Sequence, residues 1–463
     1  MNKHQDFSRR RFLSASVLGG AAGAGALWDP GLLAAQTAGV KRGDLADLII
    51  KEVKIYVTDL KDLRRLNTTE TGELLSVVTS NGIEGNYTIG DRNRTEGWLE
   101  WAKKTLVGKS VIDLLPTLTS TSGMKGPAGF DAQPLRRPGV PNPAAGGAND
   151  GPGSGPAFGG AAVAGSGLQT RGMGSWPNWY TAAADVCLWD ILGKYVGRPI
   201  YQILQGGAKN KTRMLAYASS LHLPTIEDYV PDLLKAKEQG YRGYKIHPGR
   251  GQHATGAQIP SYVGHMEEIR QVRKAAGDDY VLIHDPVQQY NRYEALKVGR
   301  LLDELGYLWF EDPIRTTDQE GLIELQSKLD LPLHVGEFLY SIADFAEYIK
   351  KDALGVVRLI ADNVGGISGS MRVGLLADAH GLECAPHNWG NVFDLALHFH
   401  IELALPNAYW FEMPFPAQYT DRPYFKYQFR IDKDGYVPAP TEPGLGYPID
   451  KDALDNITQR INR

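Results

Sequence analysis

The chain has 463 residues, of which 43% are hydrophobic and 22% charged, so it can bury a large core and form more than one domain. Its formal net charge of −4 gives no reason to expect a nucleic-acid partner. Its two cysteines, Cys187 and Cys384, are too few for a disulfide framework, and both stand in apolar patterns typical of buried thiols. Composition therefore argues against a disulfide-rich scaffold and a nucleic-acid-binding protein.

The amino terminus resembles an export signal. Residues 8–14 read SRRRFLS, and an apolar run rich in glycine and alanine continues to residue 27. This pattern is similar to a twin-arginine signal peptide, which we assign to residues 1–38. The run is too short and too glycine-rich to predict a spanning helix, although an uncleaved anchor is the alternative. We expect a periplasmic protein without stable membrane insertion after signal removal.

Residues 45–195 have the pattern of an α+β domain. Alternating apolar residues predict strands at 48–57 and 72–82, a third short strand or loop follows, and helical patterns occupy 95–106 and 179–195. Strands followed by helices, without regular alternation, favour a separate domain. Residues 120–174, dominated by Gly, Pro and Ala, predict an insertion that is a flexible excursion rather than a lid.

A different sequence pattern begins at residue 212, where predicted strands and helices alternate. A repeat of about 25 residues that carries one strand and one amphipathic helix is the unit of a parallel (β/α) barrel, so we predict an α/β barrel of the TIM type over 212–412. Residues 413–463 show no further repeat and are expected to return to the first domain. The predicted strands are 212–220, 241–247, 280–285, 307–311, 331–337, 355–361, 382–387 and 408–412.

Three carboxylates close successive apolar runs of this repeat. Asp285, Glu311 and Glu337 are separated by 26 residues each (285 to 311, 311 to 337), so they are expected at the carboxyl ends of neighbouring strands. Crowded carboxylates raise one another's pKa unless a cation neutralises them, and hard oxygen ligands suit Mg²⁺. The three residues are therefore candidate Mg²⁺ ligands. Three unrelated surface acids would leave their shared spacing unexplained.

The same spacing marks the later strands. His387 follows Glu337 by 50 residues and Glu412 follows His387 by 25, and halving the longer interval points to Asp362. A carboxylate that holds one imidazole nitrogen fixes the tautomer, so we predict that Asp362 orients His387 as a general acid or base. Glu412 could hydrogen-bond a substrate carboxylate, which would require that Glu412 be protonated or act through a neighbouring proton.

Lys245 and His247 stand two apart on the second predicted barrel strand, so their side chains share a face. A lysine beside a metal and other cations can have its pKa lowered towards working pH, which makes Lys245 a candidate base. His247 is a candidate second base, acid or hydrogen-bond donor. In the alternative interpretation, the lysine is ion-paired to a barrel carboxylate and the histidine is satisfied in a polar core.

The order of these motifs resembles the enolase superfamily, in particular its mandelate racemase subgroup. The resemblance rests on the lysine motif, Glu311 in FEDP, the GE at 336–337, a VGGI segment at 364–367, and LWDILGKYVGRPIYQILQGG at 188–207. It implies a modified TIM barrel with an α+β capping domain. It also implies Mg²⁺ ligands at Asp285, Glu311 and Glu337, bases at Lys245 and His387, and an electrophile at Glu412.

The chain departs from that pattern at two positions. His247 stands where many members have a second lysine, and Ile360 stands where the aspartate that partners the histidine is usual. We retain Asp362 as the partner because it fits the 25-residue period and shares a strand face with Ile360.

The resemblance implies abstraction of the proton alpha to a carboxylate through an ene-diolate, with dehydration of an acid sugar as the leading reaction. Racemisation, epimerisation or cycloisomerisation of a hydroxy acid is the close alternative. A non-catalytic periplasmic protein that binds sugar acids is the alternative from another class. The expected partners are a small carboxylate substrate and further copies of the chain in a homo-oligomer.

Overall fold

The computed structural model describes residues 48–58, 72–88, 92–118, 177–204, 211–249 and 261–463. The predicted export signal and the insertion at 120–174 lie outside these ranges. Within them, every helix is too short or too polar to cross a membrane.

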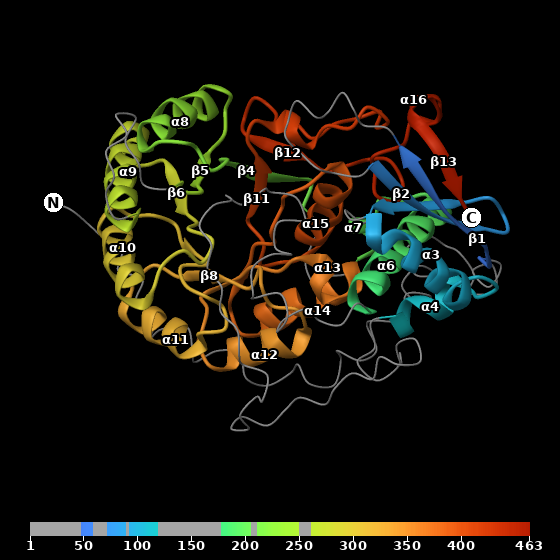
Figure 1. The fold of residues 1–463 in the computed structure, drawn as a ribbon, viewed down its shortest axis with the longest axis horizontal. Coiled ribbons are helices and arrows are strands. Elements are labelled where there is room, and N and C mark those ends of the chain that lie inside the picture. Colours follow the sequence, from blue (N-terminus) through green and yellow to red (C-terminus); the bar gives the residue numbers. More distant parts are fainter. Residues whose placement is uncertain (1–47, 59–71, 89–91, 119–176, 205–210, 250–260) are drawn as a thin grey trace.

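A four-stranded antiparallel sheet forms the core of the capping domain. Its strand order is β13-β1-β2-β3, so the last strand of the chain pairs with the first (Figure 1). The C-terminal segment therefore completes the N-terminal sheet, which ties the two ends of the described chain together. The strands are β1 (Ile50–Thr58), β2 (Gly72–Thr79), β3 (Glu84–Thr88) and β13 (Thr458–Asn462).

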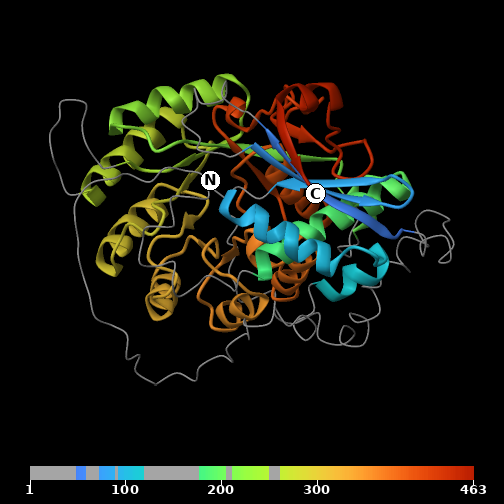
Figure 2. The same ribbon diagram turned by 45° about the vertical axis from the view of Figure 1, so that its right-hand side comes forward.

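One helix of the capping domain, α6, packs between this sheet and the barrel. Its residues from 181 to 192 are all buried, because its surface meets the sheet on one side and barrel helices on the other. Figure 2 shows it, in green, behind the sheet. The helices are α3 (Arg92–Thr105), α4 (Val111–Leu118), α6 (Pro177–Val196) and α7 (Ile200–Ile203), joined near the C-terminus by α16 (Lys451–Ile457).

The barrel contains the eight predicted parallel strands. The first seven pair with their neighbours in chain order, and the eighth pairs with the first. A backbone hydrogen bond from Cys384 N to Asn407 O, 2.9 Å, links β10 to the approach of β11. The strands are β4 (Arg213–Ser219), β5 (Gly243–Ile246), β6 (Val281–His284), β7 (Phe310–Glu311), β8 (Leu333–Val335), β9 (Val356–Val357), β10 (Glu383–Cys384) and β11 (Trp410–Pro414).

Barrel helices begin at polar caps shortly after the strand ends. Asn291 and Asn391 each form a capping box, and Asp318 and Ser341 accept hydrogen bonds from the first turns of their helices. These caps fix where each mouth loop stops. The helices are α8 (Tyr229–Glu238), α9 (Ser261–Ala276), α10 (Arg292–Glu304), α11 (Gln319–Lys328), α12 (Ile342–Lys350), α13 (Ala361–Val364), α14 (Gly366–Ala379) and α15 (Val392–Ala404), with short turns η4 (Ile226–Asp228) and η5 (Ala417–Thr420) and a short strand β12 (Tyr436–Pro438) paired to β4.

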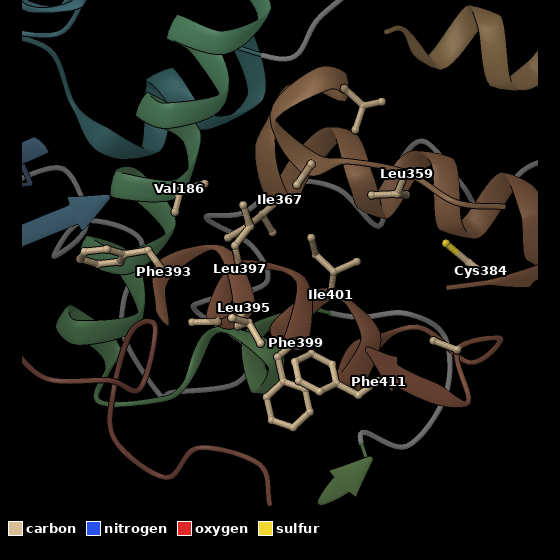
Figure 3. Close-up of a cluster of buried hydrophobic side chains, with 14 of the residues drawn as sticks. Val186, Leu359, Ile367, Cys384, Phe393, Leu395, Leu397, Phe399, Ile401 and Phe411 are labelled. Atoms are coloured by element: carbon tan, nitrogen blue, oxygen red, sulfur yellow. The ribbon is translucent and has the colours of Figure 1, made fainter. Parts of the chain in front are cut away.

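One continuous apolar core joins the barrel helices to the capping domain. Figure 3 shows Val186 of α6 near Ile367 of α14 and Leu397 of α15, with Phe399 and Phe411 deeper in the barrel wall. Both predicted buried cysteines, at positions 187 and 384, are free thiols in this core. The capping domain is therefore packed onto the barrel rather than tethered to it.

The VGGI segment lets α6 approach the barrel closely. Gly366 has φ +80°, and a Cβ there would lie 2.6 Å from Asp185 Oδ2 and 2.9 Å from Ala182 O. Asp185 accepts hydrogen bonds from Ser368 N (3.0 Å) and Ser368 Oγ (2.6 Å), and Trp189 Nε1 donates to the same hydroxyl (2.9 Å). The second glycine of the segment is thus required by this joint.

Gly366→Ala should destabilise the protein by about 2–4 kcal/mol, because it combines a strained positive φ with a steric clash against α6. Gly381→Ala is the matched control, since Gly381 has φ +70° with no atom within 4 Å of the added Cβ. The control should cost about 1 kcal/mol in denaturant unfolding. Equal losses for the two variants would contradict the close packing at Gly366.

Candidate active site

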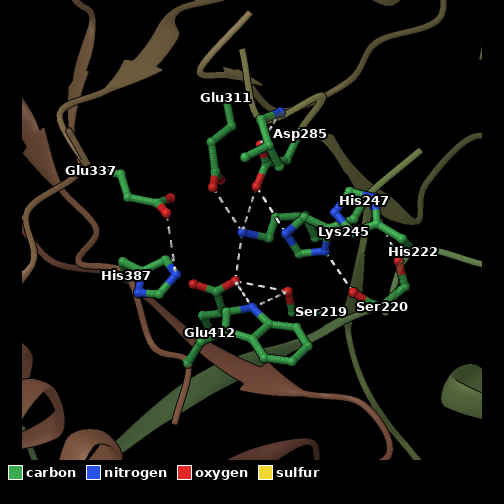
Figure 4. Close-up of polar contacts among 12 residues, drawn as sticks. Ser219, Ser220, His222, Lys245, His247, Asp285, Glu311, Glu337, His387 and Glu412 are labelled. Atoms are coloured by element: carbon green, nitrogen blue, oxygen red, sulfur yellow. Dashed lines mark hydrogen bonds and ion pairs between the residues drawn. The ribbon is translucent and has the colours of Figure 1, made fainter. Parts of the chain in front are cut away.

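The charged side chains predicted from the sequence gather at the carboxyl ends of the barrel strands. Figure 4 shows Lys245 at the centre, with His247 on one side and His387 with Glu337 on the other. Asp285 and Glu311 approach from the far wall and Glu412 from the near wall. Six separate strands or strand ends therefore contribute to one polar cluster, as the barrel repeat predicted.

Lys245 is fully buried among three carboxylates. Its Nζ lies 3.2 Å from Asp285 Oδ2, 2.8 Å from Glu311 Oε1 and 2.5 Å from Glu412 Oε1. Burial and the Arg358 cation lower its pKa, but the three carboxylates outweigh them and hold the pKa above its ordinary value. The lowered pKa that we expect for Lys245 beside a metal stays a prediction, and the charges of the chain itself act in the opposite direction. The ion-paired lysine of the alternative interpretation is what the structure contains.

His247 is held beside Lys245 by both of its ring nitrogens. Nε2 lies 2.9 Å from Asp285 Oδ2, and Nδ1 lies 2.6 Å from the carbonyl oxygen of Ser220. The indole of Trp389 packs edge-on to the imidazole, with ring centroids 5.7 Å apart. Both nitrogens thus face oxygen atoms, which fixes the orientation of the ring beside Lys245.

Glu412 accepts hydrogen bonds at both of its oxygens. Ser219 Oγ (2.7 Å) and Trp389 Nε1 (3.1 Å) donate to Oε1, and the backbone N–H of Asn388 (3.0 Å) donates to Oε2. Burial raises its pKa, but Arg358 and Lys245 outweigh burial and hold the pKa well below its usual range. Glu412 is therefore an acceptor, which disfavours direct donation from its carboxyl group to a substrate carboxylate, whereas an action through the neighbouring proton of Lys245 stays a prediction.

His387 and Glu337 form the opposite wall and are the more open members of the cluster. His387 Nε2 lies 3.7 Å from Glu337 Oε1, and the two side chains are 19% and 17% exposed. Burial and the Arg358 cation hold the pKa of His387 well below its usual range, which favours the neutral ring. His387 is therefore a partly exposed imidazole at the mouth.

Gly336 explains how Glu337 reaches this wall. It has φ +137°, and a Cβ there would lie 2.5 Å from Phe345 Cε1 and 2.6 Å from Arg358 O. The chain therefore turns sharply after β8 in a conformation that excludes larger residues. In the GE motif, the glycine thus allows the sharp turn that places Glu337 at the mouth of the barrel.

The predicted pairing of Asp362 with His387 is wrong. Strand β9 ends at Val357, and residues 361–364 form helix α13, so Asp362 does not stand at a strand end. Its Oδ1 accepts a hydrogen bond from Tyr87 OH of the capping domain (3.0 Å), and the same hydroxyl contacts Asp394 Oδ1 (3.3 Å). The regular spacing placed Asp362 correctly along the chain, but a helical turn directs it towards the capping domain.

Two buried cluster members were missed from the sequence because they lie inside apolar runs rather than at their ends. Arg358, in VVRLI, is 2.6 Å from Glu311 Oε1 through Nε and 3.0 Å from Glu412 Oε2 through Nη2. His334, in LPLHVGE, places Nδ1 3.0 Å from Glu311 Oε2 and Nε2 2.8 Å from Ala385 O. The sequence did contain a signal for both residues, namely a charged or imidazole side chain inside an apolar run of valine and leucine.

The cluster contains more negative than positive charge. Asp312, directly after Glu311, is 1% exposed, and both of its carboxylate oxygens lack a hydrogen-bond partner among the described residues. Burial raises the pKa of Glu337 to about 7, an effect that Asp285 increases and Arg358 opposes. Orphaned carboxylate oxygens beside other acids fit a divalent cation with hard oxygen ligands.

The candidate ligands do not converge as a ready-made metal site. Across the described ranges, no group of three Asp, Glu, His or Cys side chains is positioned to hold a metal ion. In the structure Lys245 contacts both Asp285 and Glu311, and Arg358 contacts both Glu311 and Glu337. The residues fit Mg²⁺ in chemistry and charge, while two cations of the chain already bind their carboxylates.

Known proteins are similar to this chain in sequence and in fold. Residues 229–453 match the family described as Enolase C-terminal domain-like. Arabinonate dehydratase from Saccharolobus solfataricus is 31% identical over 272 residues, which cover 58% of this chain and 69% of that protein. The chain belongs to the enolase superfamily.

Two further members extend the comparison. L-talarate/galactarate dehydratase from Salmonella typhimurium is 29% identical over 297 residues, covering 64% of this chain and 67% of that enzyme. The crystal structure of D-glucarate dehydratase from Agrobacterium tumefaciens complexed with magnesium has a TM-score of 0.65 at 24% identity, and covers 89% of this chain and 100% of that chain. This enolase-superfamily chain has the modified TIM barrel and capping domain that the resemblance implied.

Asp362→Asn should lower kcat/KM by less than about tenfold, because Asp362 does not orient the base, whereas His387→Asn should lower it by about 10²–10⁴-fold. Both values are measured on an acid sugar that the protein turns over. A loss in Asp362→Asn as large as that in His387→Asn would restore the dyad.

Proposed function

We propose that the protein is a Mg²⁺-dependent dehydratase of an acid sugar, which removes the proton alpha to the carboxylate and expels the β-hydroxyl. The observation that carries this proposal is the placement of His387 with Glu337 on one wall of the mouth, facing Lys245 and His247 on the other. The dehydratase names of the curated relatives support the reaction class. The export signal predicted at 1–38 supports a periplasmic enzyme.

His387 is assigned as the base. It takes the proton from the carbon beside the carboxylate, and the electron pair of that C–H bond forms the new C=C bond as the C–O bond to the β-hydroxyl breaks. The hydroxyl leaves as water after it receives a proton from the opposite wall. The resulting enol then becomes the 2-keto-3-deoxy acid by taking up a proton at the β-carbon.

The acid is assigned to the wall formed by Lys245 and His247. Lys245 is held as an ammonium by three carboxylates, and His247 is fixed beside it, so this wall has a proton to give. Asp285 contacts both residues and keeps them in place. A base and an acid on opposite sides are what elimination across a C–C bond requires.

Asp285, Glu311 and Glu337 are the residues that would hold Mg²⁺. When bound there, the ion supplies a Lewis acid that stabilises negative charge developing on the substrate carboxylate. The buried carboxyl group of Asp312, whose two oxygens lack a hydrogen-bond partner among the described residues, stands directly after Glu311, and burial raises its pKa. Glu412 supports this site indirectly, because its carboxylate forms ion pairs that hold Lys245 and Arg358 in position.

Racemisation, epimerisation or cycloisomerisation is the second candidate. One observation favours it: titratable side chains stand on both walls, His387 on one and Lys245 with His247 on the other, as proton transfer at either face of one carbon requires. The choice depends on whether the substrate loses its β-hydroxyl, which an experiment on product and solvent exchange decides.

The protein should be incubated with a panel of mono- and diacid sugars and Mg²⁺ in deuterated water. At least one sugar should yield a 2-keto-3-deoxy acid, which NMR and mass spectrometry detect. Deuterium exchange at the α-carbon without loss of water would favour the racemase or epimerase instead. Tight binding by calorimetry with neither exchange nor product would contradict an enzyme and support a sugar-acid binding protein.

Glu311→Gln should weaken Mg²⁺ binding by at least about tenfold and abolish turnover, because it removes one of three anionic ligands. Calorimetric titration of Mg²⁺ measures the first effect without a substrate. Glu347→Gln, on the exposed face of α12, is the control and should change neither quantity. Near-normal Mg²⁺ affinity in Glu311→Gln would remove the assigned metal site.

A further inference from the structure

Four charged side chains close a ring across the barrel interior. Lys245 Nζ contacts Glu311 Oε1 (2.8 Å), Glu311 Oε1 contacts Arg358 Nε (2.6 Å), Arg358 Nη2 contacts Glu412 Oε2 (3.0 Å), and Glu412 Oε1 returns to Lys245 Nζ (2.5 Å). Each side chain is at most 1% exposed. Positive and negative charges alternate around the ring, so every charge has two opposite neighbours.

The ring is one layer of the barrel. Lys245 comes from β5, Glu311 from β7, Arg358 from the residue after β9 and Glu412 from β11, which are alternate strands. Alternate strands of a parallel barrel contribute the four side chains of each interior layer, and these are usually branched apolar residues. Here two positive and two negative groups replace them and sum to zero charge.

The remaining strands supply the layer above this ring. Asp285 follows β6, Glu337 follows β8 and His387 follows β10, and the latter two are the partly exposed members of the cluster. The uncompensated negative charge therefore lies on the mouth side of a neutral floor. Arg358 reaches from the floor to this layer, with Nε 3.4 Å from Glu337 Oε2.

We propose that Arg358 is a positioning residue that serves as a built-in counter-ion: it holds Glu311 and Glu412 in place without a metal, and it weakens Mg²⁺ binding by placing a positive charge between Glu311 and Glu337. A buried ion pair that loses one partner leaves an uncompensated charge, which is strongly destabilising. A positive charge close to two ligands of a cation opposes the binding of that cation. Arg358 therefore lowers the affinity for Mg²⁺, and it keeps Glu311 and Glu412 in position when the metal is absent.

The contacts of Arg358 differ from those of an arginine that only supports the fold. Arg273 is also buried, but its guanidinium donates to the backbone carbonyls of Gly277, Tyr280 and Gly306. The ion pairs of Arg358 within the described ranges are all with carboxylates of the site. Removal of Arg273 should thus affect stability alone, whereas removal of Arg358 should also affect the metal.

Arg358→Met should lower the Tm of the metal-free protein by at least about 5 °C and bind Mg²⁺ at least about fivefold more tightly than wild type in calorimetry. Mg²⁺ should raise the Tm of this variant more than it raises that of wild type. Arg273→Met is the control, which should lower the Tm without changing Mg²⁺ affinity. Arg358→Lys keeps the charge and should retain near-wild-type affinity while losing stability, because one ammonium cannot meet all three carboxylates.

Charge balance within the ring gives a second test. Glu412→Gln alone leaves two cations facing one carboxylate, and the double variant Arg358→Met/Glu412→Gln returns the ring to one charge of each sign. The decrease in Tm of the double variant should therefore be smaller than the sum of the decreases measured for the two single variants. If Arg358→Met folds only with Mg²⁺ present, that result also supports the proposal.

Additive losses in the double variant, or Mg²⁺ affinity in Arg358→Met that is unchanged or weaker, would overturn it. The affinity arm rests on the proposed Mg²⁺ site, whereas melting of the metal-free variants does not. A wild-type protein that binds no Mg²⁺ would therefore count against the proposed function and leave the ring to be judged by the melts.

Discussion

Burial of negative charge at the mouth of the barrel is the constraint on which this structure depends. Asp285, Glu311 and Glu412 stand almost fully inside the protein, where an unpaired carboxylate is too costly to tolerate. Lys245 and Arg358 offset that cost by forming ion pairs with these carboxylates, and their positions determine which acids are neutralised by the chain itself. What is left over, on the mouth side, is the charge that a metal and a substrate can use.

This division gives the two levels of the barrel different tasks. The lower level, built on alternate strands, is electrically balanced and fixes the geometry of Glu311 and Glu412. The upper level carries Glu337 and His387, which are partly exposed and incompletely paired, and is where chemistry can occur. The capping domain is joined to the same end of the barrel by close packing at Gly366 and by the Tyr87–Asp362 hydrogen bond, so the cap and the mouth are positioned together.

The sequence predicted the barrel and its eight strands because one strand and one helix repeat about every 25 residues, and the acids at 285, 311 and 337 share a phase with that repeat. It failed where tertiary packing overrides period: Asp362 keeps the spacing but lies in a helical turn, because β9 stops at Val357. It also missed Arg358 and His334, since a search for polar residues at the ends of predicted strands passes over those inside their apolar runs. The protonation of Lys245 could not be predicted, because it depends on three carboxylates from other strands.

Anomalous scattering from crystals soaked in Mn²⁺, as a stand-in for Mg²⁺, would locate the metal in the barrel. We predict a single site on the mouth side of the ring, bordered by Asp285, Glu311 and Glu337, with Lys245 and Arg358 still joined to Glu412 beneath it. A metal found below the ring or outside the barrel, or an Arg358 guanidinium expelled from the acids when the metal binds, would contradict it.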